Sequence, residues 1–402
     1  MTPGSDSSAE TTNAEMPAMS LLGVFLVFLR LGLTSFGGPV AHLAYFRDEF
    51  VARRRWLDEQ TYAELVALCQ FLPGPASSQV GIGIGLLRAG WAGAVVAWLG
   101  FTLPSALLMA GFAAGVVANP AWLGTGWLAG VKLAAVAIVA QAVWSMARSH
   151  CPDGPRRVLA LAALVLCLSG SGALLPPGVL LGAGLVGGLW LRAETSPGRA
   201  SWRALSPRVG YGLLLVFAAG LAWSLFGAEA GTSPLASGVY RAGALVFGGG
   251  HVVLPLLQQE FVPGLMDRDT FIAGYGMAQA VPGPLFSFAA YLGTVAGGWS
   301  GAAMATVAVF LPGALLVLGV MPFWSRWRVQ ARLRAALSGV NAAVVGLLAA
   351  AFIDPIGRGS LHSAADIAIA LGAFLALQFA RCPSWLLVGA CALAGQMSGL
   401  AG

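Results

Sequence analysis

The sequence predicts an all-α polytopic membrane protein with about 13 hydrophobic segments, in which two inverted-topology repeats of six segments flank one extra segment. Three observations lead to this prediction. Of the 402 residues, 58% are hydrophobic and 9% are charged, against a charged share of about 25% in soluble domains. The apolar residues form long uninterrupted runs, and the same motifs recur in both halves at matching spacing.

The chain divides into four parts. Residues 1–19 are polar, with no basic region ahead of an apolar core, so we expect a disordered tail and not a cleaved signal. The first repeat is expected over 20–192, a linker with one extra transmembrane helix over 193–235, and the second repeat over 236–402. The apolar runs lie near 21–46, 62–87, 90–117, 126–147, 157–174, 176–191, 210–227, 237–262, 271–295, 299–322, 336–353, 364–380 and 384–400.

The two repeats are related by an internal duplication. One register aligns Arg30 with Arg241, and a register two residues shorter aligns Gln70 with Gln279. The motifs that these registers pair are Phe36-Gly37-Gly38 with Phe247-Gly248-Gly249, and Pro73-Gly74-Pro75 with Pro282-Gly283-Pro284. An inverted repeat of this kind is typical of transporters.

The basic residues favour re-entrant hairpins over 13 plain crossings. With plain crossings, the basic loop at 47–55 faces away from the basic loops after segments 4, 6 and 10, against the positive-inside rule. If the first two segments of each repeat enter and leave on one side, 17 of the 22 basic residues lie inside and the halves remain inverted. We therefore expect these segments to be broken or re-entrant, turning at the glycine and proline motifs.

Breaks at these motifs indicate a binding site. A broken helix leaves backbone groups unpaired, which lipid does not tolerate unless the break is buried in protein or lines a watery cavity. Free N–H groups at half-helix N-termini favour an anion. The alternative is that these motifs are packing kinks, since glycine and proline are common in membrane helices. The predicted substrate-binding positions at the breaks are Phe36, Gly37, Gly38, Pro73, Gly74, Pro75, Phe247, Gly248, Gly249, Pro282, Gly283 and Pro284.

Three cations lie within apolar runs. Arg30 and its equivalent Arg241 are candidates for anion contact, with snorkelling to the headgroups as the alternative. Lys132 is the only lysine in the chain, and its equivalent is the neutral Asn341. No acid lies within a helical turn of Lys132, so a distant acid or an anionic substrate is needed, and we predict a substrate or gating role.

Small polar residues at the breaks complete the predicted site. The candidates for hydrogen bonds to a tetrahedral oxyanion are Ser35, Gln70, Ser77, Ser78, Gln279 and Ser287, each of which can equally serve as helix-packing glue. The candidates for proton coupling are His42, Glu49, His251 and Glu260, for which solvation at loop borders is an equal explanation.

The motif set resembles the chromate ion transporter family in its long, two-domain form. The stretches that carry the resemblance are "FLRLGLTSFGGPVAHLAYFRDEFV", "QFLPGPASSQVG", "FGGGHVVLPLLQQEFV" and "GYGMAQAVPGPLFSFAAYLG". The resemblance spans about 20–400. It implies a cytoplasmic-membrane carrier that exports chromate, a tetrahedral dianion shaped like sulfate, and thereby confers chromate resistance.

Two alternatives stay open: a sulfate or other oxyanion transporter or exchanger, and a passive anion channel, because broken helices also build selectivity filters. An enzyme such as a chromate reductase is not expected, since no cofactor motif or ligand cluster is evident. We expect no cofactor, no metal and no nucleic-acid partner. The expected partners are chromate, sulfate as a competitor and the lipid bilayer, while homodimerisation is left open.

Overall fold

The computed structural model describes residues 20–170, 172, 174–192, 205–226, 233–262 and 264–397. Within these ranges the chain is helical and has no strand. The predicted tail at 1–19 and part of the predicted linker lie outside the described residues.

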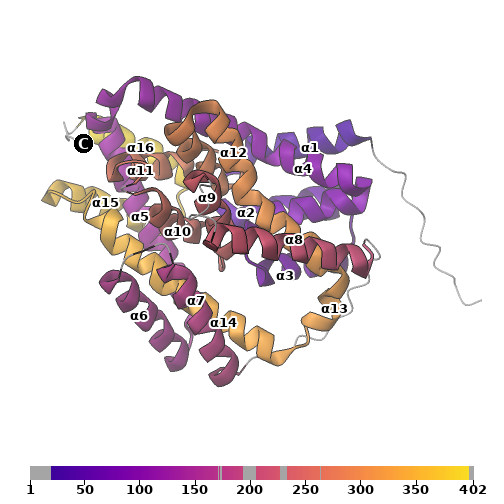
Figure 1. Ribbon diagram of the computed structural model, residues 1–402. Helices are drawn as coiled ribbons and strands as arrows, with labels where there is room; N and C mark the ends of the chain where they lie inside the picture. The colour runs from indigo at the N-terminus through magenta and orange to yellow at the C-terminus, as the bar shows by residue number, and fades with distance from the viewer. Residues whose placement is uncertain are drawn as a thin grey trace, which may run out of the picture.

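The first half contains α1 (Leu21–Thr34), α2 (Gly38–Arg47), the π-helical η1 (Asp48–Arg53), α3 (Glu59–Phe71), α4 (Ala76–Ala118), η2 (Pro120–Gly124), α5 (Gly126–His150), α6 (Gly154–Ser169) and α7 (Leu175–Trp190). The extra helix of the predicted linker is α8 (Pro207–Phe226), which lies against α12 (Figure 1).

The second half contains α9 (Pro234–Leu245), η4 (Gly250–Val252), α10 (Val253–Phe261), α11 (Arg268–Ala278), η5 (Leu285–Ser287), α12 (Phe288–Val320), η6 (Met321–Phe323), α13 (Trp324–Trp327), α14 (Ala331–Ala351), η7 (Phe352–Gly357), α15 (Ala364–Gln378) and α16 (Ser384–Met397).

The helices break at all four predicted motifs. In the first half, α1 ends at Thr34 before the glycine pair, and α3 ends at Phe71 before Pro73-Gly74-Pro75. In the second half, α9 ends at Leu245 and α11 at Ala278. The breaks interrupt runs that are otherwise apolar, as the sequence predicts.

Helix α4 is a tight helical hairpin and not one straight rod. The backbone leaves helical geometry at Ala89 and Gly90, where Gly90 has φ 66°. A Cβ placed on Gly85 would lie 2.3 Å from the carbonyl oxygen of Gly93, although eight residues of straight helix span about 12 Å. The chain therefore reverses here and packs the two glycine faces together.

The same reversal occurs in α12. Gly297 and Gly298 leave helical geometry with nearly the same dihedral angles as Ala89 and Gly90. Across this turn, a Cβ on Gly293 would lie 2.2 Å from the carbonyl oxygen of Gly301. Both reversals fall between the predicted segments, at 88–89 and at 296–298.

Helices of one half pack closely on helices of the other. A Cβ on Gly130 of α5 would lie 2.0 Å from the carbonyl oxygen of Cys391 on α16. In the equivalent arrangement, a Cβ on Gly339 of α14 would lie 2.3 Å from the carbonyl oxygen of Ala183 on α7. Figure 1 shows α7 and α14 side by side at the lower edge of the molecule. The halves are therefore intertwined and do not form two separate bodies.

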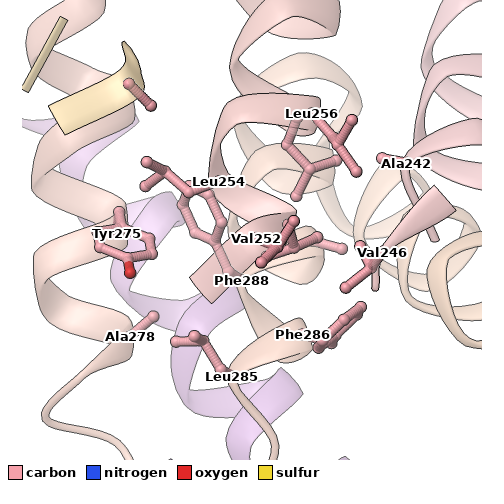
Figure 2. Close-up of a cluster of buried hydrophobic side chains, with 14 of the residues drawn as sticks. Ala242, Val246, Val252, Leu254, Leu256, Tyr275, Ala278, Leu285, Phe286 and Phe288 are labelled. Atoms are coloured by element: carbon pink, nitrogen blue, oxygen red, sulfur yellow. The ribbon is translucent and has the colours of Figure 1, made fainter. Parts of the chain in front are cut away.

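The largest hydrophobic core lies around the breaks of the second half. Val246, Val252, Leu285 and Phe286 lie together there, from segments far apart in the sequence (Figure 2). Met109 and Val139 of the first half belong to the same cluster. The core thus holds the broken segments in place with side chains from both halves.

Among the described residues, five helical stretches are long and apolar enough to cross a membrane: Ala76–Ala118 and Leu285–Trp327, which contain the two reversals, and Gly126–His150, Pro207–Phe226 and Ala331–Gly357. Four shorter apolar helices accompany them: α1, α7, α15 and α16. The protein is a multi-pass membrane protein. The number of segments that fully cross and the inverted topology stay predictions.

Candidate functional site

The four breaks meet in two reciprocal pairs across the halves. The Gly74 N–H of the first Pro-Gly-Pro donates to the carbonyl oxygen of Val246, next to the second Phe-Gly-Gly, at 2.7 Å. The Gly283 N–H of the second Pro-Gly-Pro donates to the carbonyl oxygen of Ser35, next to the first Phe-Gly-Gly, at 2.8 Å. Ser35 and Val246 are equivalent positions of the duplication. Each break therefore provides a hydrogen-bond partner for a backbone group of another break, and the four breaks form one connected region.

Glycine is required at the centre of both Pro-Gly-Pro motifs. Gly74 has φ 122° and Gly283 has φ 96°, values that other residues rarely adopt. A Cβ on Gly74 would lie 3.0 Å from Cα of Gly313, and a Cβ on Gly283 would lie 3.0 Å from Oγ of Ser105. Each motif thus closes against the reversed helix of the opposite half.

Buried polar atoms surround this crossing. The hydroxyls of Ser35, Ser78 and Thr102 and the amide oxygen of Gln79 are buried and have no hydrogen-bond partner among the described residues. Each unsatisfied buried group costs about 1–3 kcal/mol, so a concentration of them calls for a functional explanation. Hydroxyl donors of this kind suit an oxyanion.

Gln79 makes the crossing asymmetric. Its amide nitrogen donates to the carbonyl oxygens of Pro73, at 2.9 Å, and Gly313, at 3.1 Å. The equivalent residue in the second half is Phe288, which is fully buried. Gln79 is not part of the predicted site, although its place one residue after Ser78 in an apolar run is a signal that could have indicated it.

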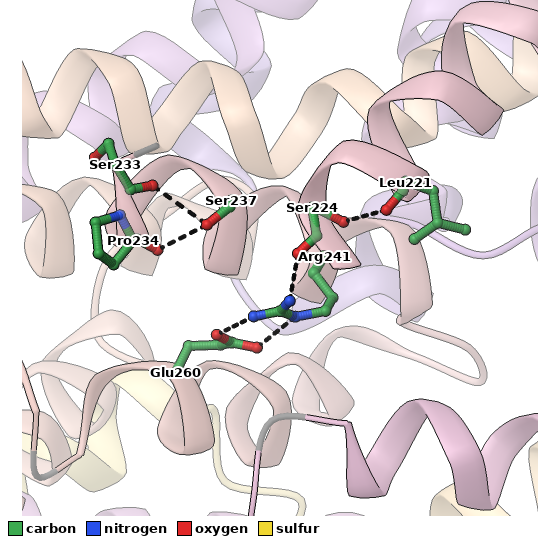
Figure 3. Close-up of polar contacts among 7 residues, drawn as sticks. All are labelled: Leu221, Ser224, Ser233, Pro234, Ser237, Arg241 and Glu260. Atoms are coloured by element: carbon green, nitrogen blue, oxygen red, sulfur yellow. Dashed lines mark hydrogen bonds and ion pairs between the residues drawn. The ribbon is translucent and has the colours of Figure 1, made fainter. Parts of the chain in front are cut away.

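The equivalent arginines have different surroundings. Arg241 is buried and forms a bidentate pair with Glu260, with N–O distances of 2.7 and 2.6 Å, and also donates to the carbonyl oxygen of Ser224 (Figure 3). The Arg30 side chain is 58% exposed, and its guanidinium lies 3.9 Å from Glu49, the equivalent of Glu260. The structure places both arginines beside an acid of their own half.

Arginines surround Glu49, which was predicted to carry protons. Arg53 and Arg54 both pair with it, in addition to Arg30. Burial alone would raise the pKa of Glu49, but the hydrogen bond and charge of Arg54, with the charges of Arg53 and Arg30, hold the pKa below its usual value. Glu49 therefore stays ionised over a wide pH range.

Both predicted histidines contact a hydroxyl of another helix, and His251 is half-buried. His42 is buried, with Nδ1 3.4 Å from Oγ of Ser77. Nδ1 of His251 lies 2.8 Å from the hydroxyl of Tyr275. His42 thereby contacts α4, which follows the first Pro-Gly-Pro, and His251 contacts α11, which precedes the second.

Lys132 has the distant acid that its burial requires. Its side chain on α5 is 6% exposed, and Nζ lies 3.2 Å from Oδ1 of Asp269 at the start of α11. Next to this pair the two helices are in close contact, since a Cβ on Gly276 would lie 2.7 Å from the carbonyl oxygen of Val131. The pair therefore closes the contact between α5 and α11.

The contact between α3 and α14, which are equivalent to α11 and α5, is open. A polar cavity of about 500 Å³ lies between α3 and α14. Two predicted site residues, Gln70 and Asn341, line it. The position on Gly248 that a Cβ would occupy is 3.5 Å from Oδ1 of Asn341, so the cavity wall adjoins the second Phe-Gly-Gly break.

The cavity also contains charges that the sequence analysis did not single out. Glu64 of α3 pairs with the buried Arg328, and accepts a hydrogen bond from the indole N–H of Trp324 at 2.9 Å. Arg334 lines the cavity as well. Trp324, Arg328 and Arg334 lie in or beside a predicted basic loop, and Glu64 lies near the start of the predicted apolar run 62–87, so none gave a local signal of a binding role.

The remaining predicted site residues lie at the break segments. Ser287 is buried in η5. The carbonyl oxygen of Gln279 accepts a hydrogen bond from the Ser384 hydroxyl at 3.1 Å, and the Phe36 ring lies 5.8 Å from the Trp385 ring. Helix α16 thus covers both of these break segments.

A multi-pass membrane protein with four broken helical segments that meet across two repeats belongs to the class of membrane transporters. The family described as "Chromate transporter" matches this chain twice, over residues 22–188 and 234–396. The chain belongs to that family.

Curated relatives resemble the chain over most of its length. The "Chromate transport protein" of Pseudomonas aeruginosa is 33% identical over 361 residues, which are 86% of this chain and 83% of the relative. The protein of that name from Cupriavidus metallidurans is 28% identical over 97% of this chain and 96% of its own length. The "Probable chromate transport protein" of Synechococcus elongatus is 28% identical, with 89% and 90% covered. No solved structure matches the chain.

Proposed function

We propose that this protein is a secondary transporter that exports chromate across the cytoplasmic membrane and thereby confers chromate resistance. Membership of the chromate transporter family supports chromate as the substrate. The observation that carries the mechanism is the difference between two equivalent helix contacts: α5 and α11 are closed, while α3 and α14 enclose a cavity. A carrier opens such contacts one at a time, whereas a channel needs both open together.

The contacts between loops support the proposed orientation. Glu64, on the helix after the basic loop at 47–55, pairs with Arg328 of the basic stretch 326–334, so these two predicted inside regions are neighbours. The re-entrant arrangement leaves Arg268 and Arg358 outside. Arg268 lies 3.1 Å from Asp354, and it also approaches the segment of Arg358. In this orientation the cavity faces the cytoplasm and the Lys132–Asp269 contact closes the outer side.

Substrate binding is proposed at the crossing of the four breaks. The backbone N–H groups of the broken segments and the buried hydroxyls of Ser35, Ser78 and Thr102 supply donors without net charge. The intramembrane cation Lys132 is proposed as a gate, because its partner is an acid of the other half. Arg241 is held by Glu260 and by the carbonyl oxygen of Ser224, so we assign it a supporting role.

Uptake of labelled chromate into inside-out vesicles tests this proposal. The vesicles contain the full chain, and vesicles without it are the control. Uptake is measured with and without an imposed proton gradient, and with excess sulfate as competitor. We expect saturable uptake that requires the gradient, and inhibition by sulfate would show how loosely the site discriminates.

Two results would contradict the proposal. Flux that rises linearly with chromate concentration and needs no gradient would identify the alternative, a passive anion channel. Saturable uptake of sulfate without uptake of chromate would identify a transporter for a different oxyanion.

A further inference from the structure

We propose that the cavity between α3 and α14 is a binding site for a tetrahedral dianion, at which Arg334 and Ser338 make the first contact with the substrate. The inference rests on the proposed function, since it assigns the position at which that substrate enters. It adds two residues that neither the motifs nor the breaks indicate.

Polar residues of α14 form a stripe along the cavity. Arg334, Ser338 and Asn341 are spaced four and three residues apart, so they lie on one face of the helix, and all three line the cavity. The stripe supplies a guanidinium, a hydroxyl and an amide in succession toward the Phe-Gly-Gly break that Asn341 approaches. These are the donor groups that bind oxyanions in proteins.

The opposite wall of the cavity is formed by α3. Helix α3 presents Gln60, Ala63, Ala67 and Gln70 to the cavity, at a spacing of three to four residues. The small alanines leave space, and the two glutamines add amide donors. Gln70 is the next-to-last residue of α3, directly before the Pro-Gly-Pro break. The cavity therefore leads from the surface to both kinds of break.

The charged residues that line the cavity have a net positive charge. Glu64 is the carboxylate that lines the cavity, and the buried Arg328 pairs with it. Among the described residues, no carboxylate lies within ion-pair distance of Arg334. The lining thus carries one positive charge beyond the Glu64–Arg328 pair, which favours an anion over a neutral or cationic ligand.

Equilibrium binding of labelled chromate to the purified full-length protein tests the site. The measurement uses neutral detergent without anionic lipid, so that a lipid headgroup cannot occupy the cavity. We expect Arg334→Gln to weaken chromate binding roughly tenfold, because a charge-assisted hydrogen bond is lost, and Arg334→Lys to retain most of the affinity. The transport KM for chromate should rise by the same factor.

Arg332→Gln is the matched control. Arg332 lies half a turn from Arg334 on the same helix, is exposed and does not line the cavity. We expect Arg332→Gln to bind chromate like the unchanged protein. Equal weakening by both substitutions would overturn the proposal, because it would mean that the general surface charge, and not a site, attracts the anion.

Ser338→Ala keeps the test decisive if Arg334→Gln fails to fold, and should weaken binding about fivefold through the loss of one hydrogen bond. Unchanged binding in Ser338→Ala and Arg334→Gln together overturns the site while the transport proposal stands. Chromate binding that depends on Arg334 in a protein that moves no chromate contradicts the transport proposal and leaves the site intact. Competition by sulfate would assign the site to tetrahedral dianions in general.

Discussion

The two halves of this protein contain equivalent parts in different surroundings. In α11, the run Phe271–Gly276 is buried throughout, and α5 closes against it. In the equivalent α3, Ala63 and Ala67 are exposed to the cavity that separates α3 from α14. The two equivalent helix pairs therefore differ within one structure: α5 and α11 are in contact, while a cavity separates α3 from α14.

The difference follows from a few substitutions between the copies. Gly276 allows α11 to approach the backbone of Val131, while the equivalent Ala67 adds a methyl group to α3. The ionic pair Lys132–Asp269 corresponds to the neutral amides Asn341 and Gln60. The small Gly276 and the opposite charges of Lys132 and Asp269 favour the closed contact between α5 and α11. The contact between α3 and α14 lacks both features and is therefore easier to open. Duplicated helices can therefore act as unequal gates.

The largest expected effect is a difference in stability between variants of the two arginine–glutamate pairs. Arg241→Gln leaves Glu260 buried without its cation, so we expect a loss of about 3–5 kcal/mol in the free energy of unfolding. Arg30→Gln affects an exposed side chain and should cost less than about 1 kcal/mol. Thermal unfolding of both purified variants in detergent measures the difference. Equal losses would mean that the two pairs stabilise the protein equally, which would contradict the expectation from their different burial.

The next largest effect is expected when a larger side chain is introduced at each of the two helix contacts. Gly276→Leu forces a side chain into the backbone of α5 and should destabilise the protein by about 3 kcal/mol. Ala67→Leu places the same side chain at the cavity and should change stability by less than about 0.5 kcal/mol. Thermal unfolding again gives the result.

Transport adds a second readout for Ala67→Leu. The leucine should block closure of α3 onto α14, so the variant is expected to be stable and to transport chromate poorly. A stable Ala67→Leu protein with normal chromate transport would show that α3 and α14 do not need to close.

The smallest effect concerns the ion pair. Lys132→Asn gives α5 the residue of its equivalent α14, and because Asp269 is half exposed we expect a cost of about 1 kcal/mol to the closed contact. That corresponds to about fivefold faster labelling of a cysteine placed at the buried Ala273 by an impermeant thiol reagent. The same chain without the added cysteine controls for the five native ones.

The reciprocal change transfers the ion pair to the open contact. Gln60→Asp with Asn341→Lys should favour closure of α3 onto α14 and slow the labelling of a cysteine at position 338 by a similar factor. No change in labelling in either experiment would show that the ion pair does not decide which contact is open.

Much of the architecture was predictable because it depends on local chemistry. A proline–glycine–proline run combines two residues that lack a backbone N–H with one that favours positive φ, so the breaks at Pro73-Gly74-Pro75 and Pro282-Gly283-Pro284 could be read directly. The apolar runs ended where α4 and α12 reverse, at positions where glycine permits the turn. The family motifs overlap the same stretches, which is why the resemblance and the comparisons agree.

The sequence by itself determined that this is a duplicated, helix-broken membrane protein of the chromate transporter family. Only the tertiary structure decided which breaks meet, that Lys132 pairs with an acid 137 residues away, and that Arg334 lines a cavity. The physical reason is that helix breaks depend on the backbone preferences of a few adjacent residues. Partners across the two halves depend on how whole helices pack, and no local pattern records that.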